Sequence, residues 1–483
     1  MNFFSTLYLL AFPIGLMGVV QIVFALLAHT VFRDGVESNF FLPAILMILC
    51  SIGLLFFSRS FDAARLNYRD ALLYAVLTWV VMGLVGALPI ITVTGVSAVD
   101  GVFESVSALT TTGATILSGL DEMPRSFLLY RQFLQWLGGL GVVVFVVAVL
   151  PMLNVGGMRL LRAETPGPVK DEKLSPRIAN TAHYLWGVYL AITLLCAAGY
   201  YFAGMSLYDA IAHSLTTVST GGFSTHDASM GYFESPAVLI VSDIFMLLGA
   251  ISFALHYQVW RRTRPGQYFL DEETRAFLLL VLLLGVIVTL FLLASSTYDR
   301  PLLAFNAAFF HLISFITSTG YGAAGFTEWP LVVVVLLLAA GYMGGCAGST
   351  AGGNKIIRNI VMVKMIRHEM RHLLHPKGVF TVKYNDQPVD ISVISATMAF
   401  ITLATLTSVL VTLLMMATGL DFLSAFSATA ACVNVLGPAF GELGNNFQPV
   451  NDAGTVILSF AMVLGRLEYF TALTLLLPAF WRG

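Results

Sequence analysis

The sequence predicts an all-α polytopic membrane protein in which four repeats of helix, short re-entrant segment and helix follow two extra transmembrane helices. Of its 483 residues, 58% are hydrophobic and only 11% are charged, whereas about 25% of an ordinary soluble chain is charged. Apolar runs recur that reach the roughly 20 residues needed to cross a bilayer. Between pairs of these runs lie four shorter helical stretches, each of which leads to a glycine.

The composition also excludes several classes of function. A net charge of -2 does not favour nucleic acid as a partner. The four cysteines have no regular spacing, and the histidines and cysteines do not form a zinc-ligand pattern. No nucleophile–base pair is visible and the loops are too short for a catalytic domain. We therefore expect no enzymatic activity and no organic cofactor on this chain.

Residues 1–69 are expected to form two N-terminal transmembrane helices, near Phe4–His29 and Phe40–Phe57. Both runs are apolar, and the first lacks the basic start that is typical of a cleaved signal peptide. Polar connections such as Arg159–Arg177 divide the rest of the chain. The resulting units are repeat 1 (70–158), repeat 2 (159–262), repeat 3 (263–372) and repeat 4 (373–483).

Each repeat is predicted to hold two full spans with a short element between them. Apolar runs place the full spans near Ala71–Thr94, Phe127–Leu153, Tyr184–Phe202, Ala237–Trp260, Thr274–Ser295, from Pro330 onward, Ser392–Ala417 and Thr455–Phe480. The short elements are Asp100–Thr112, Leu207–Ser219, Pro301–Ile316 and Phe422–Val433. They are too short to cross a bilayer, so we expect them to dip in and return, which is tolerated where backbone is buried or faces water.

The basic residues predict the orientation in the membrane. Twenty of the 25 lysines and arginines follow the second, fourth, sixth and eighth spans or stand at the C-terminus. The opposite side has only Arg33, Arg125, Arg131 and Arg300, and Arg466 lies within the last span. Both termini are therefore expected in the cytoplasm, with the short elements entering the bilayer from outside.

The four short elements align on one column of glycines, Gly113, Gly222, Gly320 and Gly437, which are 109, 98 and 117 residues apart. Glycine lets the backbone turn its carbonyl groups toward an axis, and rings of carbonyls replace an ion's hydration shell in selectivity filters. We therefore predict one pseudo-fourfold ion pore. Its filter residues are Thr110, Thr111, Thr112, Gly113, Ser219, Thr220, Gly221, Gly222, Thr317, Ser318, Thr319, Gly320, Asn434, Val435, Leu436 and Gly437.

The fourth repeat departs most from the others. Its stretch Val435-Leu436-Gly437-Pro438 lacks the hydroxyl groups that the first three repeats place before the glycine. We therefore expect this filter to bind cations less tightly, or at fewer sites, than a symmetric one.

A glycine-rich break interrupts the span that begins at Pro330. Each glycine costs a helix about 1 kcal/mol relative to alanine, so this stretch holds a regular helix poorly. One interpretation is a kink or close packing of small residues; the other is an intramembrane gate loop just inside the filter. The gate candidates are Gly344, Gly345, Gly348, Ser349, Thr350, Gly352 and Gly353. The order Gly-Lys-Ser/Thr is absent, so we reject a phosphate loop.

Arg466 is the one basic residue inside a predicted span. A charge at that depth costs at least about 2.5 kcal/mol, and it usually faces an interior cavity or a partner. A structural interpretation pairs it with Glu468 or with backbone carbonyls. The functional interpretation places it below the filter, where its charge raises the barrier to cations.

Charged residues also gather outside the spans. Carboxylates such as Asp121 and Asp227 crowd the predicted outer side, and an acidic vestibule would concentrate cations; ordinary solvated loop residues are the alternative. Glu104, Asp209 and His213 lie in the short helices, where we expect structural anchors. The stretch Lys364–Lys377 fits either a face near anionic lipid or a docking surface for a regulatory subunit.

The filter stretches, the break at Gly344–Gly353 and the segment from Gly465-Arg466-Leu467-Glu468 to Pro478-Ala479-Phe480-Trp481-Arg482 give the chain a resemblance. It resembles the Trk/Ktr/HKT superfamily of potassium transporters, and most of all the TrkH branch. The resemblance covers nearly the whole chain. It departs at Val435, where the family often has an asparagine.

The resemblance implies a homodimer with one pore per subunit, a gate at the glycine-rich break, and cytosolic TrkA-like regulatory subunits that bind nucleotides. In related transporters a serine at the first filter glycine goes with sodium transport, so four glycines favour potassium. The implied function is potassium uptake across the bacterial inner membrane by a channel-like subunit lodged in the lipid bilayer. A potassium/proton or potassium/sodium symporter is the alternative.

Overall fold

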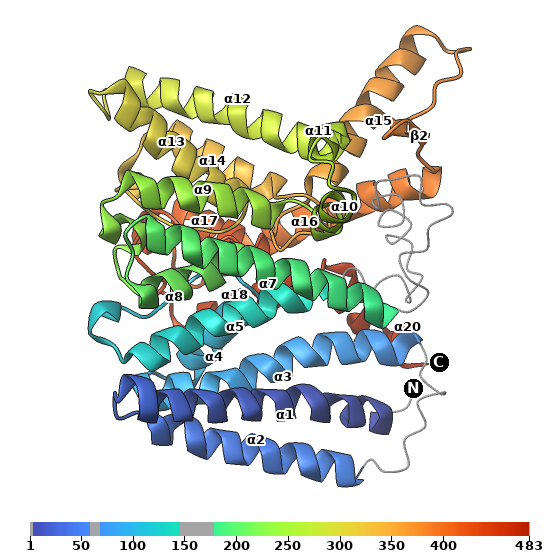
Figure 1. The fold of residues 1–483 in the computed structure, drawn as a ribbon. Helices are drawn as coiled ribbons and strands as arrows, with labels where there is room; N and C mark the ends of the chain where they lie inside the picture. Colours follow the sequence, from blue (N-terminus) through green and yellow to red (C-terminus); the bar gives the residue numbers. More distant parts are fainter. Residues whose placement is uncertain (1–2, 58–67, 145–177, 483) are drawn as a thin grey trace.

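The computed structural model describes residues 3–57, 68–144 and 178–482. These residues are mostly helical, as expected from the sequence, and the fold class is confirmed (Figure 1). Within them, the only sheet is a hairpin of two short strands, β1 (Lys383–Tyr384) and β2 (Gln387–Pro388). The end of the expected span Phe127–Leu153, the loop Arg159–Arg177 and the boundary between repeats 1 and 2 lie outside the described residues.

The N-terminal pair consists of α1 (Phe3–Leu27), continued by a π-helical turn at Ala28–Phe32, and α2 (Glu37–Phe57). Small residues let the two helices approach closely. The Ser51 hydroxyl donates to the Ala11 carbonyl at 2.7 Å, and a side chain at Gly18 would collide with Ile48. The pair lies along one edge of the molecule, with α1 against α3 (Figure 1).

The remaining helices follow the predicted order of span, short helix and span. They are α3 (Tyr68–Thr94), α4 (Ala98–Leu109) and α5 (Arg125–Val144); α7 (Ile178–Phe202), α8 (Leu207–Val218), α9 (Pro236–Ala250) and α10 (Phe253–Arg262); α11 (Gln267–Leu270), α12 (Glu272–Ala294), α13 (Pro301–Ile316), α14 (Leu331–Met343) and α15 (Ile356–Leu374); and α16 (Ile391–Ala417), α17 (Phe422–Val433), α18 (Asp452–Arg466), α19 (Phe470–Leu473) and α20 (Pro478–Trp481).

Local sequence explains where the short helices begin. The side chains of Ser97, Ser206 and Asp421 accept hydrogen bonds from the first turns of α4, α8 and α17, which satisfies amides that have no partner within a helix. The third short helix, α13, begins instead with Pro301 at its first position, where the missing N–H costs nothing.

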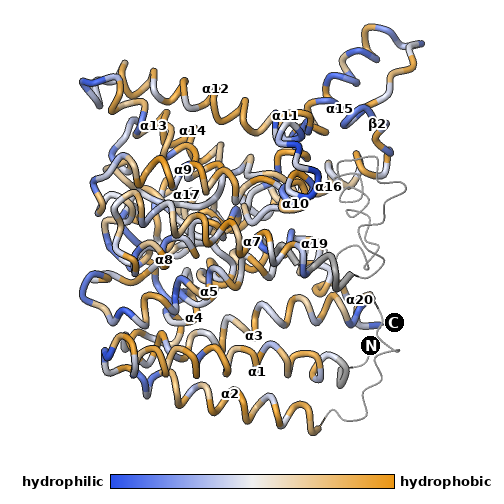
Figure 2. The backbone as a smooth tube through the Cα atoms, viewed as in Figure 1, coloured by the Kyte–Doolittle hydropathy of each residue, from blue (hydrophilic) through white to orange (hydrophobic). Residues whose placement is uncertain are grey.

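The helices have the surface of a membrane protein. In the described part of the chain, six helices are long and apolar enough to cross a bilayer. The number rises to eight if each of two bent helix pairs is counted as one span. Figure 2 shows them hydrophobic along most of their length and hydrophilic mainly at their ends. The start of α1 and helix α20 lie on the same side of the molecule (Figure 1).

Two spans that we expected to be continuous are broken. Within Ala237–Trp260, helices α9 and α10 meet at an angle of 97°, and within Thr455–Phe480, α18 bends by 111° from Phe470–Leu476. The first break is stabilised from outside, because the Cys346 amide donates to the Ala250 carbonyl at 2.8 Å and the Phe253 amide donates to the Gly348 carbonyl at 3.0 Å. The second break passes through left-handed backbone at Glu468 and Tyr469, with φ of 56° and 55°.

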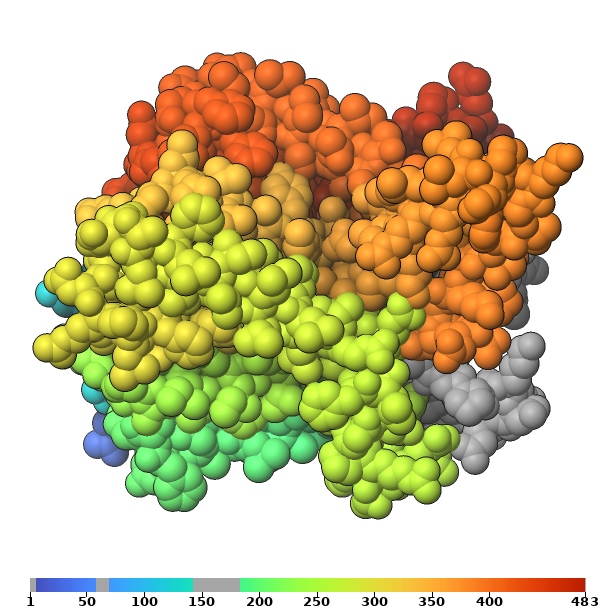
Figure 3. Space-filling view, turned by 90° about the horizontal axis from the view of Figure 1, so that it is seen from above, coloured from blue at the N-terminus to red at the C-terminus, as the bar shows by residue number. Residues whose placement is uncertain are grey.

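The buried core has two large clusters that flank the short helices. One joins repeats 2 and 3 around Tyr189, Phe253 and Phe310, and the other joins repeats 1 and 4 with α1 and α2 around Phe40 and Phe103. In Figure 3, yellow and orange residues of repeats 3 and 4 cover much of the visible face, beside green residues of repeat 2, and α15 and the β1–β2 hairpin project from it. The C-terminal ends of the four short helices meet between the two core clusters.

Candidate functional site

All four short helices end in the same backbone conformation. The residue two before the aligned glycine is left-handed in each repeat, with φ of 57° at Thr111, 51° at Thr220, 54° at Ser318 and 56° at Val435. Each glycine also has a positive φ, between 77° and 99°. The residue just before the glycine donates its amide five residues back, as from Thr319 to the Ser314 carbonyl at 2.8 Å. This left-handed ending satisfies the last carbonyls of a helix and turns the chain sharply.

The four glycines form a closed ring. A Cβ atom added at Gly113 would lie closer than 3.0 Å to the carbonyl oxygen of Gly221, in the next repeat. The same close approach joins Gly222 to the Thr319 oxygen, Gly320 to the Leu436 oxygen, and Gly437 back to the Thr112 oxygen. Each repeat therefore lies against the next, and the fourth lies against the first. The structure thus brings the predicted filter segments together around one axis.

Only glycine fits at these four positions. Each predicted segment, Thr110–Gly113, Ser219–Gly222, Thr317–Gly320 and Asn434–Gly437, has its first three residues buried. Neighbouring filter segments are too close to each other for a side chain at the four glycines, so backbone groups line the ring. Carbonyl oxygens are suited to a hard monovalent cation because they are uncharged dipoles that can replace water.

Side chains behind the ring hold the filter segments in place. The Ser107 hydroxyl donates to the Ala114 carbonyl at 2.6 Å, and the equivalent Ser314 hydroxyl donates to the Tyr321 carbonyl at 2.8 Å. The Tyr321 hydroxyl lies 2.6 Å from the Thr216 hydroxyl in the neighbouring repeat. These bonds fix the backbone just after the glycine, so the oxygens cannot rotate freely.

A buried ion pair supports the first strand. The Glu104 carboxylate accepts hydrogen bonds from the Thr115 hydroxyl at 2.8 Å, the Ile116 amide at 3.2 Å and Arg131 Nε at 3.1 Å. Both Glu104 and Arg131 are fully buried. A buried pair of this kind is tolerated better the more of its polar atoms are hydrogen-bonded. Arg131 Nη1 is buried and has no hydrogen-bond partner within the described residues, but the other contacts tie α4 and α5 to the segment that leaves the ring.

The predicted gate loop lies directly against the filter segments. The Gly352 amide donates to the Ser318 hydroxyl at 2.6 Å, and the Gly353 amide donates to the Asn434 carbonyl at 3.1 Å. The Thr350 hydroxyl lies 3.0 Å from the Val218 carbonyl. Residues 344–353 therefore contact repeats 2, 3 and 4. This stretch holds all the predicted gate residues: Gly344, Gly345, Gly348, Ser349, Thr350, Gly352 and Gly353.

Arg466 points at this loop. Its Nη1 donates to the Thr350 carbonyl at 3.0 Å, and the side chain is 8% exposed. Its Nε and Nη2 are buried and make no hydrogen bond within the described residues. The suggested partner Glu468 is paired with Arg358 instead, at 2.6 Å. Of the two structural partners considered for Arg466, the structure therefore shows a backbone carbonyl and not the carboxylate.

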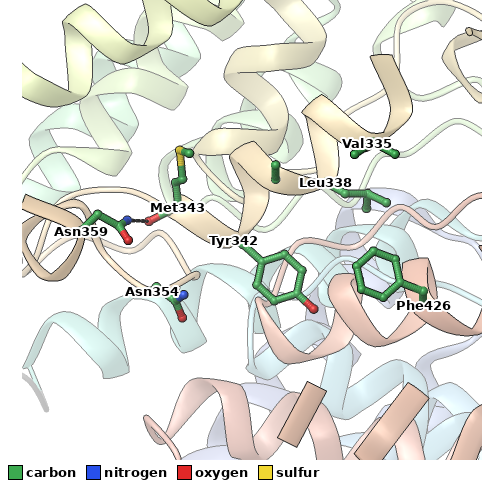
Figure 4. A pocket seen from close by; sticks show the side chains of 8 residues that line it. Val335, Leu338, Tyr342, Met343, Asn354, Asn359 and Phe426 are labelled. Carbon is green, nitrogen blue, oxygen red and sulfur yellow. Dashed lines mark hydrogen bonds between the residues drawn. The ribbon is translucent and has the colours of Figure 1, made fainter. Parts of the chain in front are cut away.

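A cavity lies beside the loop. It has a volume of about 350 Å³ and is lined by α14, α17 and the start of α15, including Tyr342, Met343, Asn354, Asn359 and Phe426. Figure 4 shows the Tyr342 and Phe426 rings next to each other at one end of the cavity, with Asn354 and Asn359 toward the other end. The loop thus has packed protein on its filter side and open space next to its end at Asn354.

On the predicted outer side, His226 links repeats 1 and 2. Its Nδ1 lies 2.5 Å from Asp121 and its Nε2 lies 3.4 Å from Asp209. Burial opposes protonation of His226, but the nearby carboxylates of Asp209 and Asp121 outweigh it and raise its pKa above the usual value. The same contact lowers the pKa of Asp121, although partial burial acts in the opposite direction.

We expect His226 to make stability depend on pH. Because its folded pKa is raised, the stabilisation is complete below the unfolded value of about 6.5 and is lost as pH rises through the folded value. The contribution to the free energy of unfolding is expected to be up to about 1 kcal/mol, since His226 and its two carboxylate partners are partly solvated. Thermal unfolding of the wild type should lose more stability between pH 6 and pH 8.5 than that of His226→Gln. Equal losses in the two proteins would contradict this assignment.

Sequence reasoning missed some residues that shape the site. Gln135, on α5, donates from Nε2 to the Gly221 carbonyl at 2.6 Å and accepts from the Phe223 amide at 3.1 Å. Its signal was a buried polar residue in an apolar span, which predicts an interior partner. Ser107 and Ser314 occupy the same position relative to the glycine column, so the repeat alignment could have found them.

Comparisons with known proteins agree with this architecture. The family model for TrkH, described as a cation transport protein, matches residues 36–481. The chain is 43% identical over 487 residues to the Trk system potassium uptake protein TrkH of Vibrio parahaemolyticus, with 100% of both chains covered. It is 42% identical to the protein of the same name from Escherichia coli (strain K12), covering 94% of this chain and 95% of that one.

A solved structure is similar over the full length. The crystal structure of the potassium transporter TrkH from Vibrio parahaemolyticus matches with a TM-score of 0.92 at 41% identity, and the match covers 100% of both chains. The family model, the sequence relatives and the fold thus agree. The chain belongs to the TrkH family of cation transport proteins.

Proposed function

We propose that this protein takes up potassium across the bacterial inner membrane as the channel-like, ion-translocating subunit of a Trk system. The closed ring of Gly113, Gly222, Gly320 and Gly437 is the observation that carries this proposal. Potassium uptake by similar proteins that match over nearly the whole chain supports the choice of ion.

The ring would select potassium through backbone oxygens. A potassium ion on the axis would exchange its water shell for carbonyl oxygens of the four filter segments. The hydrogen bonds of Ser107, Ser314 and Tyr321 hold the strands behind the ring, so the oxygens need little rearrangement when an ion arrives. The fourth segment lacks hydroxyls at Val435 and Leu436, so we expect weaker binding on that side.

Gating would come from the loop at Gly344–Gly353 together with Arg466. The loop contacts three of the four filter segments, at Thr220, Ser318 and Asn434, and the arginine is bonded to it. TrkA-like cytosolic subunits would shift this loop from the cytoplasmic side, and the subunit would act as a homodimer. Both termini would be cytoplasmic, in line with the distribution of basic residues.

Shortening the loop is expected to leave the pore leaky. Deletion of Gly348-Ser349-Thr350 removes the contact with Val218 and the arginine's acceptor. Basal potassium flux in proteoliposomes should rise about tenfold or more. A tenfold rise corresponds to a closed state destabilised by about 1.4 kcal/mol relative to the open state. Selectivity over sodium should be retained because the ring is untouched. Unchanged flux in the deletion would remove the gate assignment.

One experiment tests the proposal as a whole. Purified protein in proteoliposomes should carry potassium down its gradient, in competition with rubidium and more weakly with sodium. The reversal potential should follow potassium alone. A reversal potential that shifts with proton or sodium gradients would favour the potassium/proton or potassium/sodium symporter, and absence of potassium flux would refute the proposal.

A further inference from the structure

A buried carboxylate outside the filter binds the loop from the other side. Glu273 lies in the first turn of α12 and is 4% exposed. Its Oε1 accepts the Ala347 amide at 2.9 Å and the Ile357 amide at 3.0 Å. Ala347 belongs to the loop, and Ile357 belongs to the first turn of α15, which follows it. A single oxygen atom therefore bridges the loop and the helix after it.

We propose that Glu273 is a positioning residue for the gate: its carboxylate holds the loop in the closed arrangement beneath the filter. This inference rests on the gate role proposed above for residues 344–353. It adds a residue from the preceding span, about 70 positions away in sequence, which the glycine-rich motif does not contain.

The loop needs such an anchor because its own sequence specifies little. Five of the ten residues in Gly344–Gly353 are glycines, and glycine loses more conformational freedom on ordering than any other residue. Its position must then come from outside bonds. Hydrogen bonds to a charged acceptor are among the stronger ones available.

The anchor and the filter contacts hold opposite ends of the same short segment. Ala347, bound to Glu273, lies three residues before Thr350, which bonds to the Val218 carbonyl and accepts from Arg466. Removing the carboxylate leaves the Ala347 and Ile357 amides buried without this acceptor. Buried unpaired donors are unfavourable, so the closed loop should lose stability relative to arrangements in which these amides find water.

Space for such movement lies beside the loop. The cavity of about 350 Å³ is bordered by Met343 and Asn354, which flank the loop at its two ends (Figure 4). The filter side offers no such space, because Gly352 is packed against the Asn434 carbonyl. A released loop would therefore move away from the ring.

The neighbouring carboxylate provides a matched control. Glu272 stands in the same helical turn but bonds elsewhere: it pairs with Lys364 and accepts the Asn385 amide at 3.0 Å. A general effect of losing acidity at the start of α12 would appear in both residues. An effect through the loop would appear only at Glu273.

The test measures basal potassium flux in proteoliposomes made from the full chain without partners. Glu273→Ala is expected to raise flux about tenfold, a shift of about 1.4 kcal/mol. Glu273→Gln keeps a neutral acceptor oxygen, so it should raise flux by a smaller factor, about threefold. Glu272→Gln should stay within twofold of the wild type. Potassium over sodium selectivity should be the same in all four proteins, which a general loosening of the fold would not preserve.

The loop deletion separates this inference from the gate itself. In the Gly348–Thr350 deletion, adding Glu273→Ala should cause no further rise, because the anchored segment has already lost its filter contacts. If the deletion raises flux but Glu273→Ala and Glu273→Gln remain within twofold of the wild type, Glu273 is not the anchor although the gate stands. If the deletion itself has no effect, the gate assignment fails and the anchor with it. If Glu273→Ala does not fold, the threefold rise in Glu273→Gln decides.

Discussion

Replacing Arg466 by alanine is expected to raise potassium flux by about two orders of magnitude. At an effective dielectric constant of about 20, two positive charges roughly 6 Å apart repel by about 3 kcal/mol. Each 1.36 kcal/mol in a barrier changes a rate about tenfold. The buried guanidinium has Nε and Nη2 unpaired within the described residues, so its charge is poorly neutralised by the protein. Flux into proteoliposomes loaded with a potassium-sensitive dye measures the effect.

A lysine at this position separates the charge from the hydrogen bond. Arg466→Lys keeps the positive charge but loses the guanidinium that donates to the Thr350 carbonyl. If the charge is the barrier, Arg466→Lys should conduct as slowly as the wild type. If Arg466 acts mainly by tethering the loop, both variants should conduct faster. Flux that is level or lower in Arg466→Ala would contradict both roles.

Replacing Gly222 by alanine is expected to reduce potassium flux at least a hundredfold. The new methyl group would lie closer than 3.0 Å to the Thr319 carbonyl oxygen, which cannot shift without distorting the next filter strand. Alanine at a φ of 77° adds backbone strain of about 1–2 kcal/mol. The loss of flux should come mainly from the clash and not from the backbone strain, because the clash displaces an oxygen of the ring itself.

Gly95 provides the control for the strain. It has a similar φ of 71°, but a side chain there would meet nothing within 4 Å. Gly95→Ala should therefore share the backbone cost while flux stays near the wild-type level. Comparable flux losses at Gly95 and Gly222, in proteins of equal yield and elution volume, would show that the ring packing is not the reason.

The sequence could predict the elements because their signals are local. Apolar runs, cap residues such as Ser97 and Ser206, and the repeated glycine column each depend on neighbouring residues only. The order of spans and short helices was accordingly predicted, and the predicted bounds of the four short helices lie within three residues of those observed. The left-handed backbone before each glycine was not predictable in this way, because Val435 adopts it as well as Thr111, Thr220 and Ser318.

The breaks in two spans could not be predicted from the sequence. Residues 250–253 lie in an apolar run without proline, and the bend there is stabilised by Cys346 and Gly348, almost a hundred positions away. The sequence offered Glu468 or backbone carbonyls as structural partners of Arg466, and it could not decide between them, because Glu468 is close in sequence but bonds to Arg358. Gln135 and Glu273 act on backbone atoms of distant segments, so only the folded structure shows what they contact.

The central claim is that one monovalent cation binds inside the ring of four glycines. Crystals grown with rubidium in place of potassium would test it through anomalous scattering. A rubidium peak is expected on the ring axis, within bonding distance of carbonyl oxygens from all four segments, and it should be lost in Gly222→Ala. Rubidium peaks only at outer carboxylates such as Asp121, with none between the four segments, would contradict it.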